Sequence, residues 1–458
     1  MKIRFDDSLP AFADVIVSHC GEEAFKNGVV LRDATGRLAF FSAEPLSDDQ
    51  KDAITQALMT ALGPYARDDR CVAGPDDFGA EEILSEEPLL NVTVGKRRLR
   101  LADRRIVGAD WLRAPVERAD GPPRFVFASI KGGVGRSTAL AVTAAHLAFQ
   151  GMKVLVLDLD MEAPGLGWML LDGDTRPEFG VIDALVENGV SGWDNLFLAD
   201  LVSPSPLADN RGRIDVVPAF GKRSQNNPGE VLAKLSRAYL EDVRDEGGAD
   251  TILDQVRDLV ERLAERERYD AVLIDARAGL HETTAASIMG LGAEVLLFGL
   301  NEPQNFYGYA ALLSHLARFM PRDGSTPKWL ARLTMVQGKA ESGEEGASIT
   351  FPEACQNLFQ DAGLLNAPPT QPEPRLPEGS FSDVPWEDDD AEIDIGDIVG
   401  ETEMNAGPSV VTVNDNPKYR RFDPIRRPEL LQKGAYWDSY EELLTHIMQR
   451  LPDDGNGS

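Results

Sequence analysis

Residues 124–138, RFVFASIKGGVGRST, join a run of apolar residues to a glycine-rich segment that leads into a helical pattern. The apolar run is short and continuous, which is typical of a strand buried on both faces. Behind it, the glycines at 132, 133 and 135 let the backbone wrap closely around a ligand, so that several N–H groups point at one anion. The helix that begins near Ser137 adds the positive end of its dipole. This strand, loop and helix predict a phosphate-binding site.

The candidate phosphate-binding residues form one continuous loop. Ser137 lies at the position from which a hydroxyl ligates the Mg²⁺ ion of a bound nucleotide. A glycine-rich turn without a ligand is the alternative, and the strand before the loop and the helix after it argue against that alternative. We expect nucleotide contacts from Lys131, Gly132, Gly133, Val134, Gly135, Arg136, Ser137 and Thr138.

Apolar segments alternate with helical patterns along the chain beyond this loop. Strands that are apolar on both faces and separated by helices predict a mostly parallel sheet covered on both sides. The expected fold class is therefore α/β, with a doubly wound P-loop domain and a smaller N-terminal α/β domain. The helical patterns include STALAVTAAHLAFQG and GEVLAKLSRAYLEDVRDEGG. The predicted strands are RFVFASI, KVLVLDLD, RIDVVPAF, DAVLIDA, AEVLLFGL and RLTMVQG.

Three aspartates lie at the ends of two of these predicted strands. Asp158 and Asp160 belong to KVLVLDLD, and Asp275 belongs to DAVLIDA. The carboxyl ends of parallel strands meet at one edge of the sheet, where α/β proteins bind ligands. Asp158 and Asp160 alternate along one strand and share a face, so we expect only one of them to reach a water near the phosphates. An aspartate at a strand end is also a common cap or turn residue, and that alternative stays open for both.

The segment KGGVGRST is similar to the deviant Walker A motif, KGGVGK followed by Thr or Ser, of the ParA/MinD/Soj ATPases in the SIMIBI class of P-loop proteins. The segments LVLDLDMEAPGLG, DAVLIDARAGL and GLNEPQNFYG resemble further elements of that family, in the same order. The resemblance covers residues 124–451 apart from an acidic insertion. It implies an ATP-binding domain that uses Mg²⁺ and forms a dimer around its nucleotides.

The resemblance also implies roles for individual residues. Lys131 matches the lysine that reaches the partner's phosphates in an ATP-sandwich dimer, and Asp160 matches the aspartate that positions the attacking water. These two residues are the catalytic candidates. Asp275 matches the aspartate that holds the magnesium shell, whereas for Asp158 a place in that shell and a bond to the backbone both stay open. The candidate metal-site residues are Ser137, Asp158 and Asp275.

Two positions depart from the family pattern. Arg136 stands where the family has its P-loop lysine, and a planar guanidinium binds as a fork whereas an ammonium is a compact charge. Arginine can hold a triphosphate, but its shape puts hydrolysis in question. Arg277 replaces a proline that is common after the family's second carboxylate motif. Arg277 is expected either to contact a phosphate in the dimer or to form a salt bridge with Glu282 or Glu302.

The chain is predicted to contain two domains. Residues 1–121 form an α/β module of unknown role, in which residues 29–42 are typical of two strands joined at a Thr-Gly turn. The capping box at Ser47–Gln50 predicts the start of a helix. A P-loop domain spans residues 122–451. Within it, residues 366–408 are rich in proline and acidic residues and are predicted to be a disordered acidic insertion.

The charge balance is acidic, with 46 Lys and Arg against 76 Asp and Glu and a net charge of −30. Binding to DNA or to an anionic membrane requires a basic field, so the composition argues against both. If nucleic acid binds, we expect it at the basic stretch Lys96–Arg105, for which a partner protein, the acidic insertion and a solvated strand face are the alternatives. Neither a secretion signal nor a membrane-spanning apolar run is evident, so a cytoplasmic location is expected.

These features favour an ATP-dependent molecular switch with slow or partner-dependent hydrolysis. The expected cofactors are ATP and Mg²⁺, and the expected partners are a second copy of the chain and an unidentified protein. The alternative is a non-hydrolysing nucleotide sensor or scaffold in a multicomponent assembly, such as one for phage defence. A DNA-partitioning ATPase is a third option, which the net charge disfavours.

Overall fold

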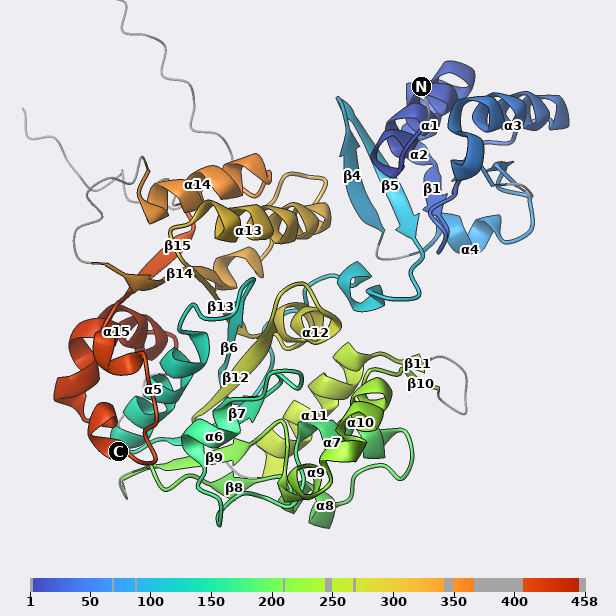
Figure 1. The fold of residues 1–458 in the computed structure, drawn as a ribbon. Coiled ribbons are helices and arrows are strands. Elements are labelled where there is room, and N and C mark those ends of the chain that lie inside the picture. Colours follow the sequence, from blue (N-terminus) through green and yellow to red (C-terminus); the bar gives the residue numbers. More distant parts are fainter. Residues whose placement is uncertain are drawn as a thin grey trace, which may run out of the picture.

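The computed structural model describes residues 3–67, 70–86, 89–208, 211–243, 249–266, 269–341, 349–365 and 407–452. These residues form a large sheet of eight strands and a smaller sheet of five strands, each packed against helices (Figure 1). The fold class is α/β, with a doubly wound, mostly parallel sheet and a smaller N-terminal α/β domain, as expected. The predicted acidic insertion lies almost entirely outside the described residues.

The larger sheet has the strand order β15-β14-β13-β6-β12-β7-β9-β8. Its neighbouring strands are parallel, except that β8 at the edge runs antiparallel to β9. All six segments predicted as strands pair in this sheet. The strands are β6 (Arg124–Ser129), β7 (Lys153–Asp158), β8 (Ser203–Pro204), β9 (Arg213–Val217), β12 (Ala271–Ala278), β13 (Glu294–Gly299), β14 (Leu333–Ala340) and β15 (Ser409–Asn414).

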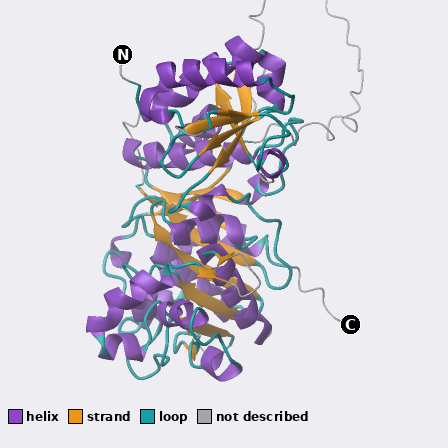
Figure 2. Ribbon diagram, turned by 90° about the vertical axis from the view of Figure 1, so that its right-hand side faces the viewer, coloured by secondary structure: helices purple, strands orange, loops and turns teal. Residues whose placement is uncertain are grey.

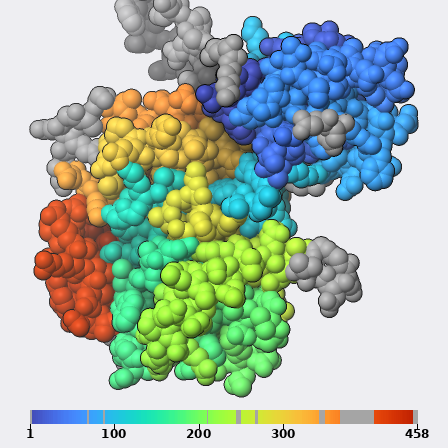
Figure 3. Space-filling model, turned by 45° about the vertical axis from the view of Figure 1, so that its right-hand side comes forward, coloured from blue at the N-terminus to red at the C-terminus, as the bar shows by residue number. Residues whose placement is uncertain are grey.

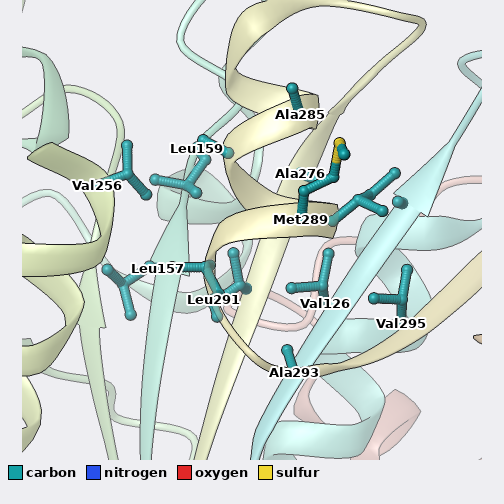
Figure 4. Close-up of a cluster of buried hydrophobic side chains, with 14 of the residues drawn as sticks. Val126, Leu157, Leu159, Val256, Ala276, Ala285, Met289, Leu291, Ala293 and Val295 are labelled. Atoms are coloured by element: carbon teal, nitrogen blue, oxygen red, sulfur yellow. The ribbon is translucent and has the colours of Figure 1, made fainter. Parts of the chain in front are cut away.

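Helices cover both faces of this sheet because its strand residues alternate between two apolar clusters. Val126 of β6 belongs to the cluster beneath α7, α11, α12, α13 and α14, whereas Phe127 belongs to the cluster beneath α5, α6 and α15. Figure 4 shows Val126 and Leu157 among the buried apolar side chains of the first cluster, which also includes Met289 of α12. The helices are α5 (Arg136–Phe149), α6 (Leu166–Leu170), α7 (Val181–Asn188), α11 (Ile252–Arg266), α12 (Glu282–Gly290), α13 (Pro303–Leu316), α14 (Phe351–Asp361) and α15 (Lys433–Met448).

The long helical pattern that begins at Gly229 forms a helix only in its first part. α10 (Val231–Ala238) is followed by β10 (Asp242–Val243), which pairs with β11 (Ala249–Asp250) in a two-stranded ribbon. Two other short helices, α8 (Asn195–Ala199) and α9 (Lys222–Asn226), lie in the same part of the chain. The described part of the chain contains no helix with the length and apolar character needed to cross a bilayer.

The N-terminal sheet has the order β3-β2-β1-β5-β4. The predicted pair of strands in residues 29–42 is confirmed, because β1 and β2 pair antiparallel. The predicted cap is also confirmed, since the Ser47 hydroxyl accepts the Gln50 N–H at the start of α3. The elements are α1 (Phe5–Cys20), α2 (Glu22–Asn27), β1 (Val29–Arg32), β2 (Leu38–Phe41), α3 (Asp48–Leu62), β3 (Val72–Ala73), α4 (Ala80–Leu84), β4 (Leu90–Val94) and β5 (Arg97–Asp103).

The segment that follows β5 packs along the larger domain. The Asp110 carboxylate accepts the Leu253 N–H at 2.9 Å, and Trp111 belongs to the apolar cluster of the large sheet. Arg322 donates to the side chain of Asn91 in β4 at 2.8 Å. Figures 2 and 3 show the smaller domain lying above the larger one. The carboxyl ends of the central strands remain free to form a site.

Candidate functional site

The glycine-rich loop connects β6 directly to α5, as the sequence predicts. Gly133 and Gly135 have φ values of 81° and 93°, which lie in the left-handed region that residues with a side chain rarely adopt. Gly135 is also the residue that precedes α5. These two glycines turn the backbone so that the loop ends at the N-terminus of a 14-residue helix, which is a favourable place for a phosphate.

A cleft of about 390 Å³ opens in front of this loop. It is bordered by most of the loop, by the end of β12 and by residues that follow β7. The lining residues are Ser129, Gly132, Gly133, Val134, Gly135, Arg136, Ser137, Thr138, Asp160, Glu162, Ala163, Met169, Arg277 and Ala278. Seven of the eight predicted nucleotide-contacting residues border the cleft, and Lys131 is outside its lining.

Ser137 and Asp275 are joined by a short hydrogen bond. The Ser137 hydroxyl donates to Asp275 Oδ2 at 2.6 Å. β12 carries Asp275 beside β6, and the two strands are parallel, so the end of one lies next to the loop that leaves the other. Burial raises the pKa of Asp275, and the charge of Arg136 opposes that effect. Asp275 is enclosed behind Ser137 and does not border the cleft itself.

Arg136 turns toward the carboxylates of the neighbouring strands. Its Nε lies 2.6 Å from Asp275 Oδ1, and its Nη2 donates to Asp160 Oδ2 at 3.0 Å. A longer bond of 3.4 Å connects Nη1 with the hydroxyl of Ser129. Only 8% of the Arg136 residue surface is exposed. The positive charge of the loop is therefore shared between two buried carboxylates.

Asp158 and Asp160 have different surroundings, although they are two residues apart. Asp158 is fully buried, and its two oxygens accept the N–H groups of Asp160 and Leu166 at 3.1 and 3.2 Å. Burial and the adjacent carboxylate of Asp275 raise the pKa of Asp158. Asp160 lies just beyond β7, borders the cleft and pairs with Arg136. Asp158 therefore binds backbone N–H groups, whereas Asp160 is the carboxylate that borders the cleft.

Two lysines lie close to the cleft but outside its lining: Lys131 at the start of the loop, and Lys339. Lys131 donates to the side-chain oxygen of Gln304 in α13. Lys339, at the end of β14, donates to the carbonyl of Gly133. It has a φ of 50°, the one positive value at a residue other than glycine in the described residues. Sequence reasoning missed Lys339, for which the Gly-Lys pair at the end of RLTMVQGK was the available signal.

Gly338 explains how closely β14 approaches the loop. A Cβ atom at this position would lie 2.2 Å from the carbonyl oxygen of Val134, so no larger residue fits without moving the loop. The strand end and the loop are therefore in direct backbone contact.

Arg277 borders the cleft and pairs with a residue that the sequence did not suggest. Its Nη1 lies 2.5 Å from Glu162 Oε1, whereas the expected alternatives were Glu282 and Glu302. Glu282 instead accepts the backbone N–H of Gly108. The pairing with Glu162 depends on the adjacency of β12 and β7, which brings the end of β12 next to the segment that follows β7.

The donor set can be compared with what magnesium requires. Mg²⁺ prefers oxygen ligands, keeps several waters and commonly uses only one or two protein groups together with nucleotide phosphates. Ser137 borders the cleft with Asp275 behind it, which fits such an ion. Asp158 does not fit, because backbone N–H groups engage both of its oxygens. In the described part of the chain, no three His, Cys, Asp or Glu side chains are arranged to hold a metal by themselves.

The basic stretch Lys96–Arg105 is largely neutralised by its own domain. Residues 97–103 of this stretch form β5, and four of the five arginines in the stretch have an acceptor from the same domain. The acceptors are carboxylates for Arg97, Arg104 and Arg105, and backbone carbonyls for Arg100. These pairs reduce the free positive charge that the strand offers to a polyanion.

Comparison with known proteins places the site within a family model. Residues 125–296 match the CobQ/CobB/MinD/ParA nucleotide binding domain. This range runs from β6 to the start of β13 and includes the loop, Asp160 and Asp275. No curated protein matches the chain.

Several solved structures are similar to the chain at low sequence identity. The cell division ATPase MinD of Pyrococcus furiosus has 17% identity and a TM-score of 0.41, over 72% of this chain and 99% of that one. MinD of Pyrococcus horikoshii OT3, complexed with Mg-ADP, has 16% identity and a TM-score of 0.40, over 71% and 96%. A plasmid partition protein of Borrelia burgdorferi B31, bound to AMPPNP, has 16% identity and a TM-score of 0.39, over 72% and 100%.

Proposed function

We propose that this chain, in which residues 125–296 form a nucleotide-binding domain of the CobQ/CobB/MinD/ParA type, is a molecular switch that binds ATP with Mg²⁺. The observation that carries the proposal is the bond of 2.6 Å between Ser137 and Asp275 at the base of the glycine loop. In this bond the Ser137 hydroxyl lies at the N-terminus of α5 and the Asp275 carboxylate lies behind it, next to a cleft that can hold phosphates.

In this proposal the residues from Lys131 to Thr138 bind the nucleotide, mainly through backbone N–H groups. Ser137 and Asp275 hold the magnesium shell, and Asp158 supports the segment that leads to Asp160. Magnesium, when bound, would supply positive charge to the phosphate oxygens. Asp160 orients a water molecule near the terminal phosphate. Because Asp160 is paired with Arg136, we expect basal hydrolysis to be slow.

Lys131 gives the proposed switch its means of dimerisation. Its side chain is bound to Gln304 and lies outside the lining of the cleft of its own chain. An ammonium that is directed away from its own cleft favours a role at the site of a second copy. The proposed domain division, residues 1–121 followed by the P-loop domain 122–451, leaves the N-terminal module available for an unidentified protein partner.

A second candidate function is a non-hydrolysing nucleotide sensor or scaffold. The specific observation in its favour is the distance of 3.0 Å between Arg136 and Asp160, since that bond occupies an oxygen needed to orient water. The two candidates differ in a single measurable quantity. A switch releases phosphate from ATP slowly, and more rapidly with its partner, whereas a sensor releases none.

Calorimetric titration with ATP tests the central proposal. Wild type should bind ATP in the presence of Mg²⁺, and Ser137→Ala should weaken that binding about 10-fold or more, because a metal ligand is lost. With magnesium chelated, wild type and Ser137→Ala should bind ATP equally. Ser325→Ala, at an exposed turn, is the matched control. A wild-type chain that does not bind ATP with Mg²⁺ present would overturn the proposal.

A further inference from the structure

Arg277 is positioned by an irregularity in β12. Between Asp275 and Ala278 the register with β6 shifts, since three steps along β12 correspond to two steps along β6, from Phe127 to Ser129. One extra residue in a strand redirects the side chains around it, and such bulges are common next to active sites. Here the bulge lies directly beside the glycine loop. It places the Arg277 side chain in the lining of the same cleft.

Glu162 holds Arg277 together with a residue from the end of α10. The carboxylate of Glu162 lies 2.5 Å from Arg277 and also accepts the hydroxyl of Tyr239. Burial, and then the hydrogen bond to Glu162, raises the pKa of Tyr239, so this residue remains a donor. His281 lies 3.9 Å from Glu162, but burial and the neighbouring Arg277 lower its pKa. Near neutral pH, Arg277 is therefore the cation that balances Glu162.

The two arginines that border the cleft differ in how firmly they are held. Arg136 is buried and paired with two carboxylates, Asp160 and Asp275. Among the described residues Arg277 has one carboxylate partner, and its side chain keeps 27% of its surface exposed. A triphosphate carries several negative charges and accepts the forked hydrogen bonds of a guanidinium. It would therefore compete for Arg277 much more readily than for Arg136.

We infer that Arg277 contacts the terminal phosphate of the nucleotide bound in its own chain, after exchanging its bond to Glu162 for one to the phosphate. The inference rests on the proposed function and adds a residue that distinguishes a triphosphate from a diphosphate. The exchange also changes the contacts of Glu162. Glu162, once released, keeps its hydrogen bond from the Tyr239 hydroxyl, so the presence of the terminal phosphate is transmitted to the end of α10.

Calorimetric affinities for AMPPNP and ADP, measured with Mg²⁺, test this inference without interference from turnover. Arg277→Ala should weaken AMPPNP binding by about 10- to 100-fold, the range expected for hydrogen bonds to a charged group. The affinity for ADP should change less than about threefold, because the diphosphate lacks the contact. Arg277→Lys should fall between wild type and Arg277→Ala, since it keeps the charge and loses the fork.

Glu162→Gln provides the opposite test. Without the competing carboxylate, Arg277 has no ion pair to Glu162 that must break before the phosphate binds. This variant should therefore bind AMPPNP more tightly than wild type does, and its affinity for ADP should stay the same. Arg223→Ala is the matched control, because Arg223 forms a comparable pair with Glu178 at 2.8 Å outside the cleft. Melting temperatures of all variants establish that they are folded.

The possible results separate this inference from the function on which it rests. Selective loss of AMPPNP affinity in Arg277→Ala supports the inference. An equal loss of affinity for both nucleotides, or no loss for either, overturns the inference. The proposed nucleotide-binding function is not affected by either result. A wild-type chain that binds neither nucleotide overturns both.

Discussion

Arg136 Nη2 lies 3.0 Å from Asp160 Oδ2, so the basic residue of the glycine loop is bound to the carboxylate expected to orient water. The same guanidinium reaches Asp275 on the next strand at 2.6 Å. Both carboxylates are almost completely buried, and charged groups in such an environment require partners. Arg136 consequently has a structural task, in addition to any contact with phosphate.

Removing this guanidinium should destabilise the protein. Arg136→Ala leaves Asp160 and Asp275 without a cation, and breaking a buried pair in this way costs about 3–5 kcal/mol. Arg136→Lys should cost less, because an ammonium retains the charge. Urea unfolding measures the difference in free energy. The exposed pair of Arg223 supplies a control, Arg223→Ala, which should change stability by less than about 1 kcal/mol. Equal effects of the two alanine substitutions would contradict the prediction.

Asp160→Asn should reduce ATP hydrolysis and spare ATP binding. The amide has the shape of the carboxylate but lacks the charge that orients a water for in-line attack. We expect phosphate release to fall about 10-fold or more, with the ATP affinity within about threefold of wild type. Asp258→Asn, at an exposed position on α11, is a control for loss of a surface charge. Phosphate release at the wild-type rate would show that Asp160 has another role.

ATP should convert the chain to a dimer that depends on Lys131. Light scattering of wild type with ATP and Mg²⁺ should give about twice the 50.0 kDa of one chain, whereas Lys131→Ala should stay monomeric. Gln304→Ala is an informative comparison, because it frees Lys131 from its present bond and should preserve the dimer. A single mass with and without ATP for wild type would argue against this mode of dimerisation.

Acid should destabilise the P-loop domain through its buried histidines. Burial lowers the pKa of His146, His315 and His446 to about 4, whereas an unfolded histidine titrates near 6.5. Between these values the unfolded chain binds more protons than the folded chain, so stability is lost as the pH falls. We expect a loss of roughly 1–2 kcal/mol per histidine on going from pH 7 to pH 5.

Melting temperatures at pH 7 and pH 5 measure this acid sensitivity. His146→Gln should make the difference between the two temperatures smaller, because it removes one of the titrating groups. His19→Gln, at an exposed position of α1, should leave the difference unchanged. An identical pH response in wild type and His146→Gln would rule out a contribution from His146.

Much of the fold follows from local patterns that the sequence carries by itself. The continuous apolar runs, such as RFVFASI and DAVLIDA, predicted strands buried on both faces, and all six of them pair in the large sheet. The glycines before Ser137 predicted a turn into a helix, because they permit a backbone conformation that other residues avoid. The cap at Ser47 is equally local, since its partner is three residues away.

The pairing of charges in the site was decided only by the tertiary structure. Whether Arg136 points at the cleft or at Asp160, and whether Arg277 finds Glu162, Glu282 or Glu302, depends on which strands are neighbours and on how the bulge in β12 directs the side chain. Contacts between residues 24 and 115 positions apart, as in these two pairs, leave no periodic signal in a single sequence. The chain alone specified a glycine loop with carboxylates at the ends of nearby strands, and packing determined which cation each carboxylate holds.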